Sequence, residues 1–214
     1  MKEIYIVGIG SYSEVMYELA TDCGYTVKGF YDAYDGDYVS EVMGKPVLGH
    51  FDECVCEDIK CKDFIVAVGD NIIRHRIMSK IDKCEGNLPT LIHPTAKIST
   101  SVHLGKGVYI HMGAVVWTMV QINDFSIISP NTVIAHHAKI GKACLISVSS
   151  VVGARVCVDD YTMFGIGSIA ITGIDRIGKN VMLGAGTTVT KNIEDNVLAV
   201  GSPARVIKQR EPIE

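Results

Sequence analysis

The sequence predicts an α/β Rossmann-like unit, residues 1–88, followed by a left-handed parallel β-helix, residues 89–214, that ends in a short C-terminal tail. Two observations carry this prediction. Between residues 92 and 164 an aliphatic or aromatic residue recurs at every sixth position without a slip. Before this repeat, short apolar runs alternate with segments of helical spacing, and the first apolar run ends in glycines.

The composition excludes several classes of protein. The chain has 214 residues, of which 48% are hydrophobic and 21% charged, so it can bury a core and is not mainly disordered. Its formal charge of −4 does not suit a nucleic-acid-binding surface. Its N-terminal residues lack the apolar core of a signal peptide, and no apolar run is long enough to span a bilayer. We therefore expect a cytoplasmic protein without nucleic-acid or membrane partners.

The first part of the chain has the order of a small parallel sheet with helical crossovers. Each apolar strand is followed by a segment of helical spacing, which is the pattern of a β-α-β unit. The expected strands are 4–10, 26–32 and 64–70, with a minor strand at 45–49, and the expected helices are 13–23 and 71–84.

The glycines after the first strand suggest a ligand. Gly8 and Gly10 stand where a dinucleotide-binding fingerprint would begin, but its third glycine is replaced by Ser13. Asp32 lies near the position of a ribose-binding acid. We expect the backbone N–H groups at the start of the first helix to meet a phosphate or polar ligand. A tight turn without any ligand is the alternative.

The second part of the chain is a repeat of six residues. The repeated positions are Ile92, Ile98, Leu104, Ile110, Val116, Ile122, Ile128, Ile134, Ile140, Ile146, Val152, Val158 and Phe164, with Ile177, Leu183 and Val189 resuming the register after a seven-residue step. The fourth residue after each position from 92 to 164 is small or β-branched. A period of six fits neither a helix nor a hairpin. It fits a chain that turns a corner every six residues and closes an 18-residue triangular coil.

The cysteines indicate thiols and no metal site. Seven cysteines are an odd number, and we expect them to be reduced and packed as small hydrophobic residues. Cys54, Cys56 and Cys61 have neither the usual C-x2-C spacing nor a following pair of zinc ligands.

The combination of both halves resembles a known family. The segments IVGIGS, GFYD, PVLG, AVGDNIIRHRI, LIHPTA, HHAKIG, LGAGTTVTKNI and GSPARVI resemble bacterial nucleotide-sugar N-acetyltransferases and the related sialic acid O-acetyltransferases. The resemblance implies an acetyl-CoA-dependent acetyltransferase that acts on a dTDP- or UDP-linked 4-amino-4,6-dideoxy sugar. It further implies a pathway of O-antigen or lipopolysaccharide biosynthesis, and a homotrimer with active sites between subunits.

The resemblance also implies roles for residues. His136 matches the catalytic base, and an imidazole, whose ordinary pKa is near 6.5, suits the removal of a proton from an amine. The family commonly has an acidic residue after this histidine, where this chain has His137, and often a second histidine where this chain has Leu145. We expect His137 to take the place of the acid. Trp117, the single tryptophan, is expected to pack in the trimer interface.

Binding residues carry over in two groups. Acetyl-CoA is expected to contact Gly165, Ile166, Gly184, Ala185, Gly186, Pro203 and Lys208. The nucleotide-linked sugar is expected to contact Gly10, Ser11, Tyr12, Asp32, Gly69, Asp70 and Asn71.

Three alternatives remain open at this point. One is an O-acetyltransferase acting on a free sugar such as sialic acid, a reaction that depends more heavily on base strength because a hydroxyl has a higher pKa than an ammonium group. Another is a non-catalytic trimeric binding protein. The third is a zinc enzyme of the γ-carbonic-anhydrase type, for which no histidine set stands out beyond His136 and His137.

Overall fold

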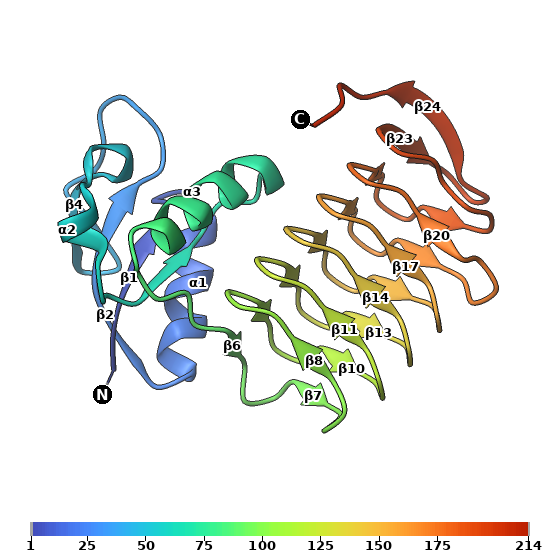
Figure 1. Cartoon of the computed structure of the whole chain (residues 1–214), viewed down its shortest axis with the longest axis horizontal. Helices are drawn as coiled ribbons and strands as arrows, with labels where there is room; N and C mark the ends of the chain where they lie inside the picture. The colour runs from blue at the N-terminus through green and yellow to red at the C-terminus, as the bar shows by residue number, and fades with distance from the viewer. Residues whose placement is uncertain (1, 214) are drawn as a thin grey trace. The chain divides into compact units, whose positions relative to one another are not determined.

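The computed structural model describes residues 2–213 and divides the chain into two compact units that meet in sequence between Pro94 and Thr95 (Figure 1). The elements of the first unit are β1 (Lys2–Val7), α1 (Ser11–Asp22), β2 (Tyr25–Asp32), β3 (Glu41–Val42), β4 (Lys45–His50), a 3-10 turn (Phe51–Glu53), α2 (Cys56–Ile59), β5 (Phe64–Val66), α3 (Asn71–Lys83) and β6 (Leu91–Ile92). The predicted strands and both long helices are present, with ends that differ by at most four residues.

The first unit is built on one sheet of order β3-β4-β2-β1-β5. All neighbouring strands run parallel except β3 and β4, which form a hairpin. The central strands are buried, as their continuous apolar sequences require, and α1 and α3 pack their apolar sides on the sheet. The carboxyl ends of β1, β2 and β5 therefore open at one edge of the sheet.

The cysteines of the first unit depart from the sequence-based expectation. Cys56, at the start of α2, and Cys84, the C-cap of α3, form a disulfide, so the expectation of reduced thiols is wrong for this pair. The fold brings their Cα atoms within 4.8 Å of each other although 28 residues separate them in sequence. The other five, Cys23, Cys54, Cys61, Cys144 and Cys157, are free thiols.

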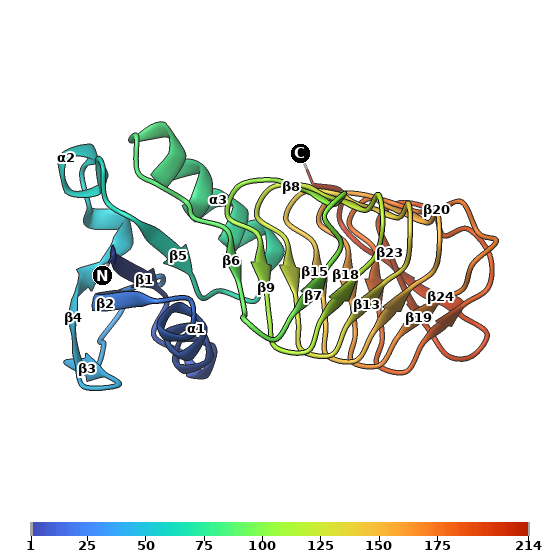
Figure 2. The same cartoon turned by 90° about the horizontal axis from the view of Figure 1, so that it is seen from below.

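The second unit is a left-handed parallel β-helix of stacked three-sided coils, seen in side view in Figure 2. Face one consists of β9 (Tyr109–Ile110), β12 (Ile127–Ile128), β15 (Leu145–Ile146), β18 (Met163–Phe164), β21 (Met182–Leu183) and β23 (Val197–Val200). Face two consists of β7 (Lys97–Ile98), β10 (Val115–Val116), β13 (Val133–Ile134), β16 (Val151–Val152), β19 (Ile169–Ala170) and β22 (Thr188–Val189). Face three consists of β8 (His103–Leu104), β11 (Gln121–Ile122), β14 (Lys139–Ile140), β17 (Cys157–Val158) and β20 (Arg176–Ile177).

The hexad positions form the core of the β-helix. In the coils from Ile110 to Val189 the repeated aliphatic or aromatic residue points inward and is at most 2% exposed. Small residues fill the inner corners, and several of those with a hydroxyl (Ser126, Thr132, Ser150 and Thr162) donate to a corner carbonyl of the next coil. Ser126 donates to the Gly141 oxygen at 2.7 Å, and Ser150 donates to the Gly165 oxygen at 3.0 Å. The second position of the pattern thus satisfies backbone acceptors inside the stack.

The C-terminal segment does not leave the stack as predicted. Residues 201–204 form a turn, and β24 (Arg205–Gln209) folds back to pair antiparallel with β23. The last coil of a solenoid exposes unpaired N–H and C=O groups along its edge strand. Pairing with β24 satisfies these groups, which explains why the tail is ordered on the stack.

Two structural absences apply to residues 2–213. No helix there is long and apolar enough to cross a bilayer. No group of three or more His, Cys, Asp or Glu side chains in this part of the chain could hold a metal ion.

The stacked core makes a stability prediction. Phe164 is fully buried between Ile146 and Leu183 of the adjacent coils. Phe164→Ala should lower the free energy of unfolding by about 3–5 kcal/mol, because it removes a large apolar side chain and leaves a cavity. The outward-facing and exposed Lys139 is the matched control, and Lys139→Ala should change this free energy by less than about 0.5 kcal/mol. Urea unfolding followed by circular dichroism measures both; equal midpoints would contradict the inward register.

Candidate active site

The predicted sugar-nucleotide residues gather at the carboxyl edge of the sheet. Gly10 follows β1, Asp32 ends β2 and Gly69 follows β5, and these three strands are neighbours in the sheet. Gly8, directly after β1, lies close to the backbone that follows β5. Only glycine fits there, because its φ is +115° and an added Cβ would lie 2.8 Å from the Ala67 carbonyl oxygen. Ligands of parallel α/β sheets bind at this edge.

Two polar side chains lie at this edge, Asp32 buried and Tyr12 partly buried. Asp32 is 6% exposed, and its Oδ1 accepts a hydrogen bond from the Tyr34 N–H at 3.2 Å. Burial raises the pKa of the Tyr12 hydroxyl, and nearby Arg74 lowers it by a smaller amount. Tyr12 therefore stays neutral at any working pH and can donate a hydrogen bond. Gly10 is the N-cap of α1 and Ser11 is its first residue, so backbone N–H groups point out of this edge.

The loop after β5 is held by a residue that the sequence-based list left out. Arg74 is fully buried and donates to the carbonyl oxygens of Val68 and Gly69 and to Oδ1 of Asn71 at 2.7 Å. Asp70 caps α3 by accepting from the N–H groups of residues 72 and 73, both at 2.9 Å. Asp70 and Asn71 thus already have partners within the chain. The i, i+3 spacing of Asn71 and Arg74 was a sequence signal for this contact.

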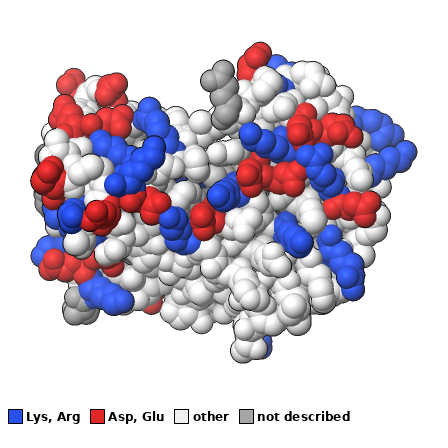
Figure 3. Space-filling model, in the orientation of Figure 1, with Lys and Arg blue, Asp and Glu red and all other residues white. Residues whose placement is uncertain are grey.

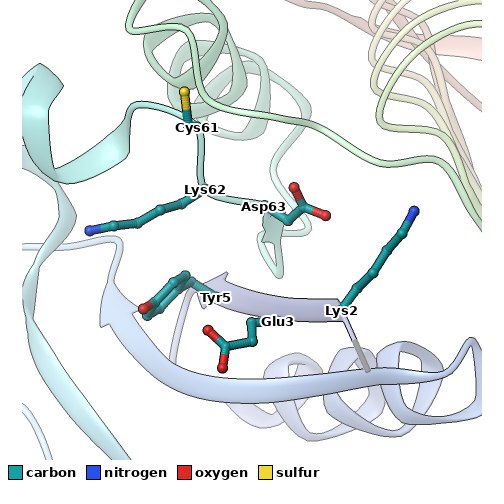
Figure 4. A pocket seen from close by; sticks show the side chains of 6 residues that line it. All are labelled: Lys2, Glu3, Tyr5, Cys61, Lys62 and Asp63. Carbon is teal, nitrogen blue, oxygen red and sulfur yellow. The ribbon is translucent and has the colours of Figure 1, made fainter.

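A separate pocket lies at the opposite edge of the same sheet, where β1 starts (Figure 4). It has a volume of about 560 Å³ and is lined by Lys2, Glu3, Tyr5, Cys61, Lys62 and Asp63. None of the predicted site residues lines it. Its polar groups are in part already engaged, since Glu3 pairs with Lys28 at 3.0 Å. The carboxyl edge therefore remains the candidate nucleotide site.

The second part of the site is a cluster of three rings at the corners between faces two and three. His136 and His137 occupy this corner in one coil, and Trp117 occupies it in the coil before. The His136 and His137 rings are perpendicular, with centroids 5.3 Å apart and Nδ1 atoms 3.1 Å apart. His137 has φ +61°, the left-handed conformation of many of the corners. Histidine adopts it more readily than most residues do.

The contact between the two Nδ1 atoms constrains the protons. A hydrogen bond there requires one Nδ1 to carry hydrogen and the other to accept. When His136 donates from Nδ1, its Nε2 keeps a free lone pair and can act as a base. In the opposite arrangement His137 donates and Nδ1 of His136 accepts. The single ring hydrogen of neutral His136 then lies on Nε2, which cannot accept another proton. His137 can therefore select the basic tautomer of His136, which is the orienting role predicted for it.

The predicted cofactor residues cluster at a different corner, between faces one and two. Gly165 and Ile166 stack on Gly184 and Ala185 of the next coil, and the Gly186 N–H donates to the Ile166 carbonyl oxygen at 2.8 Å. A Cβ on Gly165 would lie 2.6 Å from the Ala185 nitrogen, so only glycine fits at position 165. Ile166 is 62% exposed, and a Cβ on Gly186 would meet no atom within 4 Å. The backbone here is open to a ligand.

The remaining predicted cofactor residues lie in the C-terminal segment. Pro203 lies in the turn before β24, and the next residue donates its N–H to the Thr188 carbonyl oxygen. Lys208 lies in β24 and lines a pocket of about 330 Å³ together with Met182, Leu198, Gln209, Arg210 and Glu211. Two basic side chains in this pocket suit a phosphate-bearing ligand.

One chain does not bring all predicted transfer residues together. The corner with His136 and the corner with Gly165 lie at opposite edges of face two. The base and the glycine-rich corner are therefore separated by a whole side of the prism. A site that uses both corners has to take one of them from a second copy.

The family model of the PglD N-terminal domain matches residues 3–81. PerB from Caulobacter crescentus, solved with CoA and GDP-perosamine, is 31% identical, with 97% of this chain and 98% of that chain covered and a TM-score of 0.89. The chain belongs to the bacterial nucleotide-sugar N-acetyltransferase family. This membership confirms the predicted family, fold class and enzyme class.

Two further structures resemble this family member. The acetyltransferase domain of PglB from Neisseria gonorrhoeae is 26% identical over 97% of this chain and all of that chain, with a TM-score of 0.86. A histidine-to-alanine variant of a GDP-perosamine N-acetyltransferase from Caulobacter crescentus, with CoA and GDP-perosamine, is 28% identical over 98% of both chains, with a TM-score of 0.77. Segments shared with the first curated relatives span only 20 to 24% of those proteins' length.

The buried arginine makes a testable prediction. Arg74→Met should lower the free energy of unfolding by about 1–3 kcal/mol, because it leaves buried carbonyl oxygens without donors. Arg76 lies on the same helix but is exposed and paired with Asp52, so Arg76→Met is the control and should cost less than about 1 kcal/mol. Thermal unfolding and calorimetric titration with nucleotides measure stability and binding. Equal effects of the two variants would contradict the role of Arg74 in holding the loop.

Proposed function

We propose that the protein transfers the acetyl group of acetyl-CoA to the amino group of a nucleotide-linked 4-amino-4,6-dideoxy sugar. The observation that carries this proposal is the imidazole pair of His136 and His137 at an outward corner of the β-helix, in a chain of this family. The neighbours solved with CoA and GDP-perosamine support both substrate classes.

The proposed reaction is a direct transfer with His136 as general base. The amine nitrogen attacks the thioester carbonyl carbon while Nε2 of His136 accepts a proton from that nitrogen. Backbone N–H groups stabilise the resulting oxyanion. The carbon–sulfur bond then breaks, and the CoA sulfur takes a proton from the imidazolium. His137 accepts a hydrogen bond from Nδ1 of His136 throughout. No acyl-enzyme forms, because the acceptor nitrogen attacks the thioester directly.

The acceptor is bound in two parts in this proposal. Asp32, Tyr12 and the backbone of Gly10 and Ser11 bind the nucleotide and its phosphates at the carboxyl edge of the first unit, with Gly69, Asp70 and Asn71 lining the same edge. The family resemblance of the sequence implies dTDP or UDP, whereas the Caulobacter protein was solved with a GDP-linked sugar. All three nucleotides therefore belong in the test.

The donor is proposed to lie along the glycine-rich corner. Backbone that faces open space at Gly186 allows a chain such as pantetheine to run close to Gly165, Ile166, Gly184 and Ala185. Lys208 is proposed to meet the donor phosphates beside Pro203. Because acetyl-CoA is a cytosolic metabolite, we place the reaction in the cytoplasm, in the biosynthesis of a glycan such as O-antigen or lipopolysaccharide.

The active unit is proposed to be a homotrimer. Val115, Val133, Val151 and Ile169 form one outward row of apolar side chains on face two. Figure 3 shows a band of charged side chains across the second unit and, in the lower middle of the view, surface without charged side chains. Packing such faces between copies buries apolar area and brings the corner of His136 toward the glycine-rich corner of a neighbour.

The central test is acetyl transfer. CoA thiol release should occur with one member of a panel of dTDP-, UDP- and GDP-linked 4-amino sugars, with free sialic acid included. His136→Ala should lower this rate by about 10²–10⁴-fold, because it removes the base, while acetyl-CoA still binds. The matched control is His103→Ala, an outward-facing histidine on face three. Release with sialic acid alone would favour the O-acetyltransferase, and unchanged turnover of His136→Ala would remove the base from the mechanism.

The assembly is tested independently. Light scattering after size exclusion should give three times the 23.2 kDa chain mass. Val151→Asp should give a smaller species with lower activity, because a charge in an apolar interface has no partner. Lys139→Asp on face three is the control and should leave the mass unchanged. A wild-type monomer with full activity would contradict the trimer.

A further inference from the structure

Trp117 lies against the histidine proposed as base. The indole and the His136 imidazole are nearly parallel, with an interplanar angle of 21° and centroids 6.4 Å apart. The two residues come from adjacent coils, and the Trp117 N–H donates to the Ile134 carbonyl oxygen at 3.0 Å. The register of the β-helix therefore fixes the backbone positions from which both side chains project. Parallel aromatic rings at this distance attract each other.

The surroundings of the two rings are asymmetric. Trp117 lies at this corner in the coil before His136, whereas the coil after it has Gly153, Ala154 and the exposed Arg155 at the same corner. A Cβ on Gly153 would lie 2.5 Å from the Thr172 nitrogen, so the backbone admits no side chain there. The imidazole thus has the indole on one side, while the residue that matches His136 in the next coil is the small Ala154.

The indole is larger than the ring that it covers, and Trp117 is 48% exposed. An exposed aromatic face next to a base is a site for the C–H face of a sugar, because flat apolar surfaces of both partners leave water together. His137 holds the edge of His136 through Nδ1, and Trp117 contacts its face. The contact at its edge and the contact at its face together restrict rotation of the His136 imidazole.

We propose that Trp117 is a positioning residue, which holds the imidazole of His136 and carries the C–H face of the acceptor sugar. This inference rests on the proposed function. In this proposal the indole of Trp117 selects the acceptor, because a sugar with an apolar face and a 6-methyl group packs on it. The amine of that sugar then points toward Nε2 of His136. Trp117 takes no proton itself and acts by orienting the two reacting partners.

The single tryptophan makes a direct test of the contact possible. A protonated imidazole in contact with an indole quenches its fluorescence, so wild-type emission should fall on acidification. Titratable groups near the ring are His137, at the same corner, and Arg155, whose N–H binds the His136 carbonyl oxygen. His136→Asn should abolish the change and His103→Asn should keep it. A transition that persists in His136→Asn would overturn the contact.

Kinetics test the positioning role. Trp117→Ala should lower kcat/KM for the acceptor by about 10- to 100-fold, because it loosens both base and sugar, while KM for acetyl-CoA stays unchanged. Trp117→Phe should restore most of the activity, since it keeps an aromatic face. Met119→Ala is the matched control, because Met119 is an exposed apolar residue of the same corner. Equal effects of Trp117→Ala and Met119→Ala would overturn the inference while leaving the acetyltransferase intact.

The two proposals fail in different ways. Absence of transfer by the wild type with every acceptor overturns the proposed function and the sugar-binding part of this inference, while the emission experiment still decides the contact with His136. Transfer without any change of tryptophan emission on acceptor binding overturns the sugar-binding part alone.

Discussion

The corner that the chain turns every six residues is the constraint on which the rest of the β-helix depends. An inward aliphatic residue must precede each corner and a small one must follow four positions later, because the interior of an 18-residue coil has room for little else. Once these positions are filled, the two residues at the apex of each corner face outward and are free to vary. His136 and Gly186 occupy such positions, and Trp117 and Gly165 each lie one residue before an apex, so the repeat that makes the scaffold also leaves room for function.

The same constraint explains what sequence reasoning could reach. The hexad register identified the fold, the core and the outward position of His136, because each depends on a local period. The strand-and-helix order of the first unit likewise followed from short apolar runs and their spacing. What the sequence did not show are contacts that depend on the arrangement of distant segments: the Cys56–Cys84 disulfide, the return of β24 onto β23, and the placing of Trp117 on His136. The disulfide and the return of β24 follow no repeat. The coil period of 18 residues brings Trp117 into the coil next to His136, but it does not encode the orientation of the two rings.

Arg74 shows a different limit. The sequence predicts a helix over residues 71–84 that contains Arg74, but it does not identify the partners of the guanidinium, which are the carbonyl oxygens of Val68 and Gly69 and the side chain of Asn71. Asp70 is taken by the helix N-terminus and Glu85 by Lys60, at 2.6 Å. A buried guanidinium is tolerated when its donors are matched, and a strand end that exposes two carbonyl oxygens supplies that match. The predicted nucleotide loop is thus held from inside by a residue that motif reading had set aside.

The pair of histidines raises the question of how a neutral ring can do what an acidic neighbour does in related enzymes. A carboxylate fixes the tautomer of a histidine and also stabilises its protonated form. A neutral imidazole can do only the first, through one acceptor nitrogen. The indole of Trp117 offers a means for the second, because the face of an aromatic ring attracts a cation that forms beside it. His137 would then orient the imidazole of His136, and Trp117 would stabilise its protonated form. Two rings would thus perform the two roles of the acidic residue. This division fits an amine acceptor better than a hydroxyl, since the amine demands less strength from its base.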